Sequence, residues 1–346
     1  MRKYLIEPKK YYKANMHTHT TKSDGAMEPE EVKALYKKLG YSIVAFTDHA
    51  YMEDYNSYLS DEEFIAINGY ENEVINPKDS GLPLSNLPLY HFNFFSTKKD
   101  NLKMVGINEH CLNFFIPESK REEIIASFDG KKPSSVTGEI DSINQMIKEA
   151  NEKGFLVQYN HPVWSLQNYN YYIGLKGLWG LEVYNYSSYL ATFEDSNGVV
   201  LDELAKQGEF INASAGDDLH SWTHVGGGFC YIGANELTYE AVIDAMIRKD
   251  MYASCGPTFE YIYVEDNKAY VKSSEVAKIN MVTDNRRRAS TRFEVDEKHM
   301  TLDNKRTGDN CVFNIPNGVK YIRFELIDIY GKKAWTRAYN INELKV

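Results

Sequence analysis

The segment 15–49 constrains the fold more than any other part of the chain, because it predicts two short strands joined by one helix. The first strand leads into His17 and His19, and side chains two residues apart on a strand point to the same face. The helix is expected over 28–39, and the second strand ends at His49. Each histidine motif alone is weak evidence of a metal. Folding of a β-α-β unit brings both strand ends together, however, and the combination indicates a metal site there.

The later part of the chain repeats this pattern of strands that carry or precede ligand-type side chains. Further strands are expected over 64–71, 87–95, 155–159, 178–184 and 210–215. Amphipathic helices are expected over 141–153, 199–206 and 239–248. Repeated strand-then-helix units with polar residues at the strand ends predict a parallel α/β barrel.

Several of these motifs together resemble those of a known family. They are His17-x-His19, Ser23-Asp24-Gly25, Thr47-Asp48-His49, Gly69-x-Glu71, His161-Pro162 and Asp218-x-His220. This set is similar to the motifs of the PHP (polymerase and histidinol phosphatase) metal-dependent phosphoesterases. The stretch 252–257, Tyr-Ala-Ser-Cys-Gly-Pro, is similar to a junction in the CehA/McbA-like (carbaryl-hydrolase-like) branch. The resemblance implies a distorted (β/α)7, TIM-like barrel.

The resemblance also implies which residues hold metal ions. The implied ligands are His17, His19, Asp24, His49, Glu71, His91, His161, Asp218 and His220. Glu73 competes with Glu71, and His110 is a less well placed rival of His91. Asp217 adjoins Asp218, but the two-residue spacing to His220 favours Asp218.

The implied ligands fall into three overlapping sets. The sets are His17, His19, Glu71 and Asp218; Glu71, His91 and His161; and Asp24, His49 and His220. Glu71 therefore bridges two ions. Mixed histidine and carboxylate ligands fit Zn, Mn or Fe, so two or three divalent metal ions are expected as cofactors. A hydroxide that bridges two ions would be the nucleophile, because the ions lower the pKa of bound water.

Two more residues are candidates for catalytic roles beside the ligands. Asp48 is expected to orient His49 or an outer water molecule. His224 lies just beyond the last motif and is a candidate to protonate the leaving group. A polar loop residue without a catalytic role is at least as good an interpretation of His224.

From residue 258 onward the pattern changes to short strands separated by turns, which predicts a small β-sandwich. The expected division is a PHP metallohydrolase domain over 1–257 and a C-terminal β-sandwich domain over 258–346, with a structural or interfacial role.

Charge and composition narrow the function further. The 346-residue chain has a formal net charge of -10, which argues against an extended nucleic-acid-binding surface. The four cysteines form no CxxC pair. No apolar stretch is long enough for a signal peptide or a membrane span, so no membrane partner and a cytoplasmic location are expected. The oligomeric state is left open.

These observations favour a phosphoesterase that acts on a small phosphorylated substrate. Hydrolysis of a carbamate or carboxylic ester at the same ions is an alternative, as is a nuclease for short oligonucleotides. A non-catalytic metal-binding module is the alternative outside the enzymes, but all nine ligand positions are filled. The loops 51–62, 96–139 and 165–176 are expected to determine the substrate.

Overall fold

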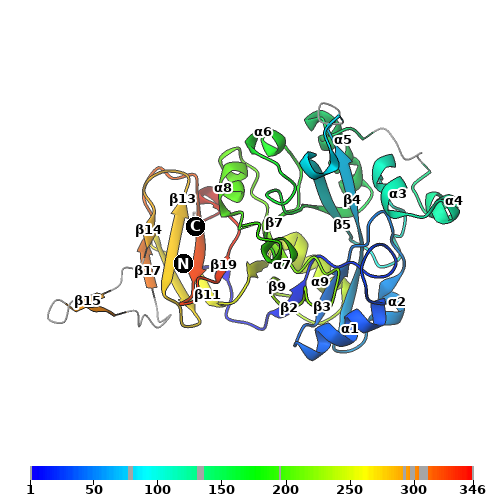
Figure 1. Cartoon of the computed structure of the whole chain (residues 1–346). Helices are drawn as coiled ribbons and strands as arrows, with labels where there is room; N and C mark the ends of the chain where they lie inside the picture. The colour runs from blue at the N-terminus through cyan, green and yellow to red at the C-terminus, as the bar shows by residue number, and fades with distance from the viewer. Residues whose placement is uncertain are drawn as a thin grey trace.

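The structure is a computed structural model that describes residues 2–76, 81–130, 136–194, 196–290, 294–296, 301–303 and 311–344. Residues 131–135 of the predicted substrate loop 96–139 therefore lie outside the described residues. A sheet of 14 strands runs through the molecule, and a four-stranded sheet lies against one end of it (Figure 1).

The predicted β-α-β unit at the start of the chain is confirmed. Strand β2 (Tyr12–Asn15) pairs in parallel with β3 (Ile43–Phe46), and helix α1 (Pro29–Lys38) connects them. Proline at the first helical position and a capping box between Glu28 and Glu31 start the helix. His17 and His19 lie just beyond the end of β2, and His49 lies beyond β3.

The sheet continues in the order β2-β3-β4-β5-β6-β7-β8. The further strands are β4 (Ile65–Ile75), β5 (Leu89–Ser96), β6 (Phe155–Tyr159), β7 (Gly180–Asn185) and β8 (Asn212–Gly216). The prediction that all these strands are parallel is wrong, because β5 runs antiparallel to both β4 and β6. The described strands also form no closed sheet, since no ladder joins β8 to β2. The fold is therefore a mixed α/β fold with one large open sheet.

Helices cover both faces of this sheet. The longer ones are α4 (Glu118–Ala126), α5 (Ile140–Glu152), α8 (Gly198–Lys206) and α9 (Tyr239–Arg248). Short helices are α2 (Tyr55–Leu59), α3 (Glu109–Phe115), α6 (Tyr169–Tyr172), α7 (Tyr186–Leu190), α10 (Ile341–Leu344) and the 3-10 turn η2 (Leu84–Asn86). Side chains of β3 alternate between the two faces: Ile43 and Ala45 pack with α9, whereas Val44 and Phe46 pack with α1.

The C-terminal strands extend the same large sheet. Strand β10 (Met251–Ser254) lies between β9 (Phe229–Ile232) and β19 (Lys333–Trp335). Beyond β19 the order is β18 (Tyr321–Ile327), β13 (Lys278–Thr283) and β14 (Ala289–Ser290), and β20 (Tyr339–Asn340) also pairs with β18. A separate ribbon consists of β15 (Glu294–Asp296) and β16 (Thr301–Asp303).

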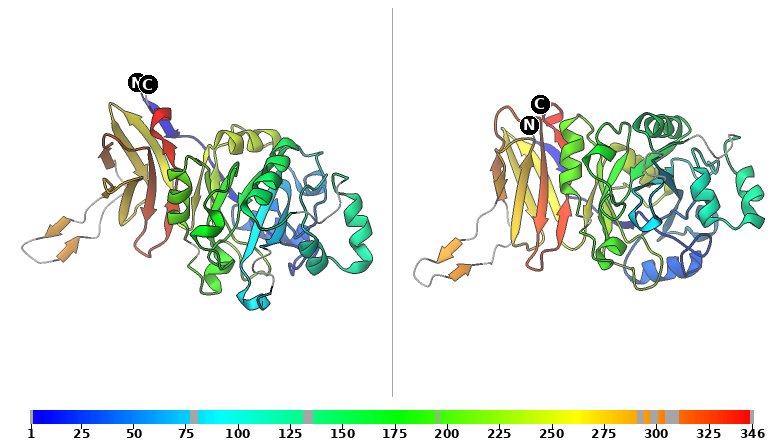
Figure 2. Two further views of the ribbon diagram at one scale, coloured as in Figure 1. Left: turned by 90° about the horizontal axis from the view of Figure 1, so that it is seen from above. Right: turned by 45° about the horizontal axis from the view of Figure 1, so that its top comes forward.

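The four-stranded sheet joins the N-terminal strand to three strands from the C-terminal part of the chain. Its order is β1 (Lys3–Ile6), β11 (Phe259–Glu265), β12 (Lys268–Ser273) and β17 (Cys311–Asn314). It packs on β13, β18 and β19 through one apolar cluster that includes Ile6, Ile262 and Phe324. The two termini lie side by side (Figure 2), where Lys3 donates a hydrogen bond to the carbonyl of Glu343.

A buried ion pair joins α8 to the C-terminal strands. Arg323 on β18 donates to Asp202 on α8 through Nε at 2.6 Å and Nη2 at 3.1 Å. The hydroxyl of Tyr321 donates to the same carboxylate at 3.1 Å. No helix within the described residues is long and apolar enough to span a membrane.

Candidate metal centre

The predicted ligands converge on one edge of the sheet. His17, His19, His49 and His161 lie just after strands, Glu71 and His91 lie within the antiparallel pair β4 and β5, and Asp218 and His220 follow β8. All of them are buried except His220, which is partly exposed, and Asp24, which lies in the loop before α1 and is exposed.

The innermost group consists of His17, His19, Glu71 and Asp218, each of which offers one ligand atom within 4.8 Å of the others. Glu71 Oε2 lies 3.2 Å from Nε2 of both His17 and His19. Asp218 Oδ1 lies 3.0 Å from His19 Nε2 and 3.3 Å from His17 Nε2. This is the first set that the resemblance implies.

In the second group, the other oxygen of Glu71 faces two further histidines, and a third approaches the first oxygen. Oε1 lies 3.1 Å from His91 Nδ1 and 3.5 Å from His161 Nε2. His49 Nδ1 lies 3.4 Å from Oε2. The two oxygens of Glu71 therefore face different imidazoles. His49, Glu71 and His91 offer mutually close ligand atoms, whereas His161 groups with His17 and Glu182.

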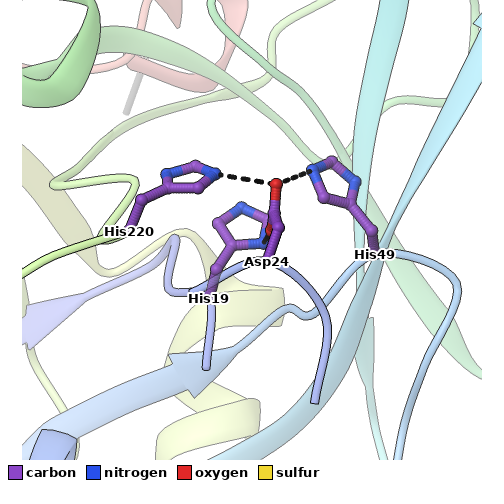
Figure 3. A group of neighbouring side chains, drawn as sticks. All are labelled: His19, Asp24, His49 and His220. Atoms are coloured by element: carbon purple, nitrogen blue, oxygen red, sulfur yellow. Dashed lines mark ion pairs between the residues drawn. The ribbon is translucent and has the colours of Figure 1, made fainter. Parts of the chain in front are cut away.

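The third group surrounds Asp24 (Figure 3). Asp24 Oδ2 lies 3.4 Å from His220 Nε2 and 3.9 Å from His49 Nε2, and Oδ1 lies 3.5 Å from His19 Nδ1. His49 thus reaches the second group through Nδ1 and the third through Nε2. His19 is an additional member that the resemblance does not place in this set.

The charges in this centre depend strongly on one another. Burial raises the pKa of Glu71, but the adjacent imidazoles of His17, His91 and His49 outweigh burial and hold the pKa well below its usual range. Burial lowers the pKa of His49 to about 3. Burial also disfavours charge on His19 and His91, but the neighbouring carboxylates outweigh burial and raise the pKa of each to about 10. His49 is therefore ready to bind a metal as a neutral ring, whereas His19 and His91 must release a proton when they bind one.

Several buried polar atoms of the centre have no hydrogen-bond partner in the part of the chain that the structure describes and are suited to bind metal ions. His19 Nδ1, His49 Nδ1 and Asp218 Oδ1 are buried and have no hydrogen-bond partner among the described residues. A buried polar atom without a partner costs free energy, and a bound cation removes that cost. Imidazole and carboxylate donors suit Zn, Mn and Fe alike. The donor set therefore fits divalent metal ions.

The part of the chain that carries seven of the nine predicted ligands matches a known family. Residues 15–210 match the PHP domain model. The chain belongs to the PHP domain family. No curated protein matches the chain significantly.

Solved structures give only distant likenesses to this PHP protein. One is a two-domain protein of Bacteroides vulgatus that contains a predicted PHP-like metal-dependent phosphoesterase, at 12% identity, 96% coverage of both chains and a TM-score of 0.42. An amidohydrolase of Chromobacterium violaceum is 15% identical, with 60% of this chain and 88% of that chain covered and a TM-score of 0.39. The lesion-specific endonuclease of Pyrococcus furiosus is 16% identical, with 69% and 56% covered and a TM-score of 0.41. At these values the likenesses say nothing about the substrate.

The PHP centre contains one buried carboxylate that sequence reasoning missed. Glu182 Oε1 lies 3.1 Å from His17 Nδ1, and its Oε2 accepts from the backbone N–H of His161 at 3.2 Å and from Asn185 Nδ2 at 3.0 Å. Its signal was a carboxylate inside an apolar strand, at Gly180-Leu181-Glu182. A buried glutamate in such a strand needs a partner.

Glu73, the rival of Glu71, lies on the opposite side of His91. Its Oε2 is 3.0 Å from His91 Nε2, whereas Glu71 faces His91 Nδ1. Its other oxygen is 2.8 Å from Nε2 of His110 on α3. Glu73 thus holds the ring of His91 at the nitrogen that faces away from Glu71. His110, the rival of His91, contacts Glu73 and not Glu71.

Asp217, the rival of Asp218, points into a different environment. Its carboxylate accepts the backbone N–H groups of Gly226 at 2.6 Å and of Gly227 and Gly228 at 2.9 and 2.8 Å. The hydroxyl of Tyr36 donates to it at 2.9 Å. The glycine-rich loop therefore holds a carboxylate of its own chain.

The two predicted catalytic residues have specific partners. Asp48 accepts from Thr20 N at 2.7 Å, from Ser23 Oγ at 2.8 Å and from Tyr55 Oη at 2.6 Å. It thereby fixes the loop that carries Asp24. His224 Nδ1 lies 3.2 Å from Ser187 Oγ, and burial lowers the pKa of His224.

A cavity of about 490 Å³ opens onto the second and third groups of the PHP centre. Its described lining consists of Asp24, His49, Glu71, Glu73, Ser85, Leu89, His91, Phe114, Phe115, His161, Trp164, Ser187, Asp218 and His220. The lining residues come from the centre, from η2, from α3 in the loop 96–139, and from the segment that follows β6. One of the three predicted substrate loops, 96–139, thus contacts this cavity through Phe114 and Phe115, and Trp164 immediately precedes a second, 165–176. Ser187, beside His224, also reaches it.

Proposed function

We propose that this PHP protein is a metal-dependent hydrolase, and more specifically a phosphoesterase that acts on a small phosphate ester. At the general level, membership of the PHP family supports metal-dependent hydrolysis. The observation that carries the proposal is Glu71, whose two oxygens face two different sets of imidazoles at 3.1 to 3.5 Å beside an open cavity.

The roles of the residues follow from these contacts. We assign the nine residues implied by the resemblance as ligands of two or three divalent ions, which when bound would activate water and stabilise charge on the substrate oxygens. Glu71 offsets the charge of two sites at once. Glu182 and Glu73 orient His17 and His91 respectively. Asp48 positions the loop of Asp24, and His224 is our candidate to deliver a proton through Ser187.

A screen of hydrolysis tests the proposal. Purified protein with added Mn, Zn or Fe should hydrolyse at least one small phosphate mono- or diester. Activity should disappear with a chelator and fall strongly in Glu71→Gln, which keeps the shape of the side chain but removes its charge. Hydrolysis that is unaffected by either change, or a complete lack of phosphatase activity with every metal, contradicts the proposal.

A carbamate or carboxylic ester hydrolase is the second candidate, and the apolar rings of Phe114, Phe115 and Trp164 in the cavity favour it. The same screen should therefore include aryl carbamates and esters. A short-oligonucleotide nuclease is less well supported, because no described lining residue is Lys or Arg. The open cavity beside the centre argues against a non-catalytic module.

We also propose the division into a metallohydrolase domain over 1–257 and a β-sandwich domain over 258–346. The strand β1 is an exception, because it lies at the start of the chain but pairs with β11 of the β-sandwich. The stretch that suggests the CehA/McbA-like branch forms the turn at this junction. Ser254 Oγ donates to the carbonyl of Pro257 at 2.6 Å and accepts from the N–H of Gly256 at 2.9 Å.

A further inference from the structure

Aromatic side chains line the cavity directly beside the predicted ligands. Phe115 on α3 stacks on His49, with ring centroids 3.6 Å apart and planes 14° apart. Phe114, its neighbour, is 58% exposed and meets Phe115 edge-on at 4.9 Å. Trp164 is 38% exposed and meets the rings of His91 and His161 edge-on at 5.5 and 5.1 Å. Leu89 adds to this apolar surface.

The charges of the cavity are confined to the centre. None of its described lining residues is Lys or Arg, and its four carboxylates are Asp24, Glu71, Glu73 and Asp218. Among the described lining residues, an anionic substrate group finds no side-chain cation, so metal ions held at the centre would have to match its charge. A second anionic group farther out would meet rings instead of a counter-charge, which costs desolvation energy. The cavity thus suits a substrate with one polar reacting group and an apolar remainder.

We propose that this cavity selects esters whose leaving group carries a flat apolar ring, packed against Phe114 and Trp164. The inference rests on the proposed function, because it assumes that an ester is hydrolysed at the centre. Aromatic rings favour offset or edge-to-face contacts with other rings, and burial of a ring removes apolar surface from water. Phe114 and Trp164 are specificity-determining residues in this account.

A pair of substrates with equal chemical reactivity tests the proposal. 2-Phenylethyl phosphate and ethyl phosphate both release primary alcohols of similar acidity, so a difference in kcat/KM reports recognition of the ring. We expect kcat/KM to be higher for 2-phenylethyl phosphate by about ten-fold or more. Equal values, or a preference for ethyl phosphate, overturn the inference. Hydrolysis of neither ester, nor of any phosphate ester in the broader screen, overturns the proposed function instead.

Substitutions of the two aromatic residues test where the ring of the substrate binds. Phe114→Ala and Trp164→Ala should each reduce the ratio of the two kcat/KM values, by roughly five-fold or more. Tyr330→Ala is the matched control, since Tyr330 is an aromatic residue with 82% exposure at the turn between β18 and β19. It should leave the ratio unchanged. A ratio that is the same in all three variants and in the wild type places the ring elsewhere and contradicts the proposal.

Discussion

Glu71 and Glu73 hold the ring of His91 from two sides, and only Glu71 also faces the other histidines of the centre. Glu71 is 3.1 Å from His91 Nδ1, and Glu73 is 3.0 Å from His91 Nε2. Both side chains are buried. A ligating histidine commonly has its second nitrogen fixed by such a carboxylate. The two glutamates are therefore a matched pair, one expected to bind metal directly and one to orient a ligand.

Replacement of Glu71 by glutamine should reduce metal affinity and turnover more than the same replacement of Glu73. Glu71→Gln should weaken binding at two ion sites and abolish most turnover. Glu73→Gln should lower Mn²⁺ affinity at one site only, by roughly ten-fold, since glutamine can still hydrogen-bond His91. Competition with a fluorescent chelator measures both affinities. A larger loss of Mn²⁺ affinity in Glu73→Gln than in Glu71→Gln would show that Glu73, and not Glu71, is the carboxylate shared by two ion sites.

The resemblance to the PHP motifs implied most of the residues that the structure brings close together at the candidate site. His17 and His19 converge as predicted, with Nε2 atoms 3.2 Å apart. Asp218 converges too, but not because it lies on a regular strand: its φ of 51° turns the backbone into the left-handed region. Glu182 was missed because no local motif distinguishes a ligand-orienting carboxylate. Its role depends on β7 lying between β6 and β8, which is a tertiary property.

At the scale of elements, most helices and strands were predicted close to their observed positions, but pairing direction was not. Helix α5 (Ile140–Glu152) agrees with the expected helix at 141–153 to within one residue at each end. Strand β5 was predicted as a strand, yet its antiparallel direction follows from the connection that returns from β4. Alternation of side chains is the same in parallel and antiparallel strands. The sequence pattern therefore could not show that β5 breaks the parallel order.

The contact between α8 and β18 makes a prediction about stability. Arg323→Ala leaves the buried carboxylate of Asp202 without its bidentate partner, and such a change costs about 3 kcal/mol. The midpoint of thermal unfolding should fall by roughly 5 °C. Arg288→Ala is the control, because Arg288 contacts the same carboxylate at 3.4 Å from an exposed position and should cost less than about 1 kcal/mol. Equal shifts of the unfolding midpoint in both variants would contradict the prediction that the buried ion pair between Arg323 and Asp202 stabilises the fold.

On the scale of the whole molecule, the two proposed domains share structure across their boundary. The large sheet passes from β9 through β10 into β19, and Tyr252 of β10 belongs to the apolar cluster of the C-terminal strands. Every predicted ligand nevertheless precedes residue 258. Stability is therefore expected to depend on both parts, whereas metal binding depends on the first.

A chain that ends at residue 257 tests this separation. It loses the pairing of β10 with β19 and the ion pair of Asp202 with Arg323, so it should unfold at a temperature lower by roughly 10 °C or more. Where it stays folded, at low temperature, it should still bind divalent ions. Circular dichroism and metal titration measure the two properties. A folded truncated chain without metal binding would show that the C-terminal strands contribute to the centre.

The buried histidines and carboxylates are expected to form a site for more than one divalent ion. Calorimetric titration of metal-stripped full-length protein with Mn²⁺ tests it most directly. We predict at least two equivalents bound per chain, because Glu71 faces two distinct sets of ligand atoms. Fewer than one equivalent in a correctly folded protein would contradict the account.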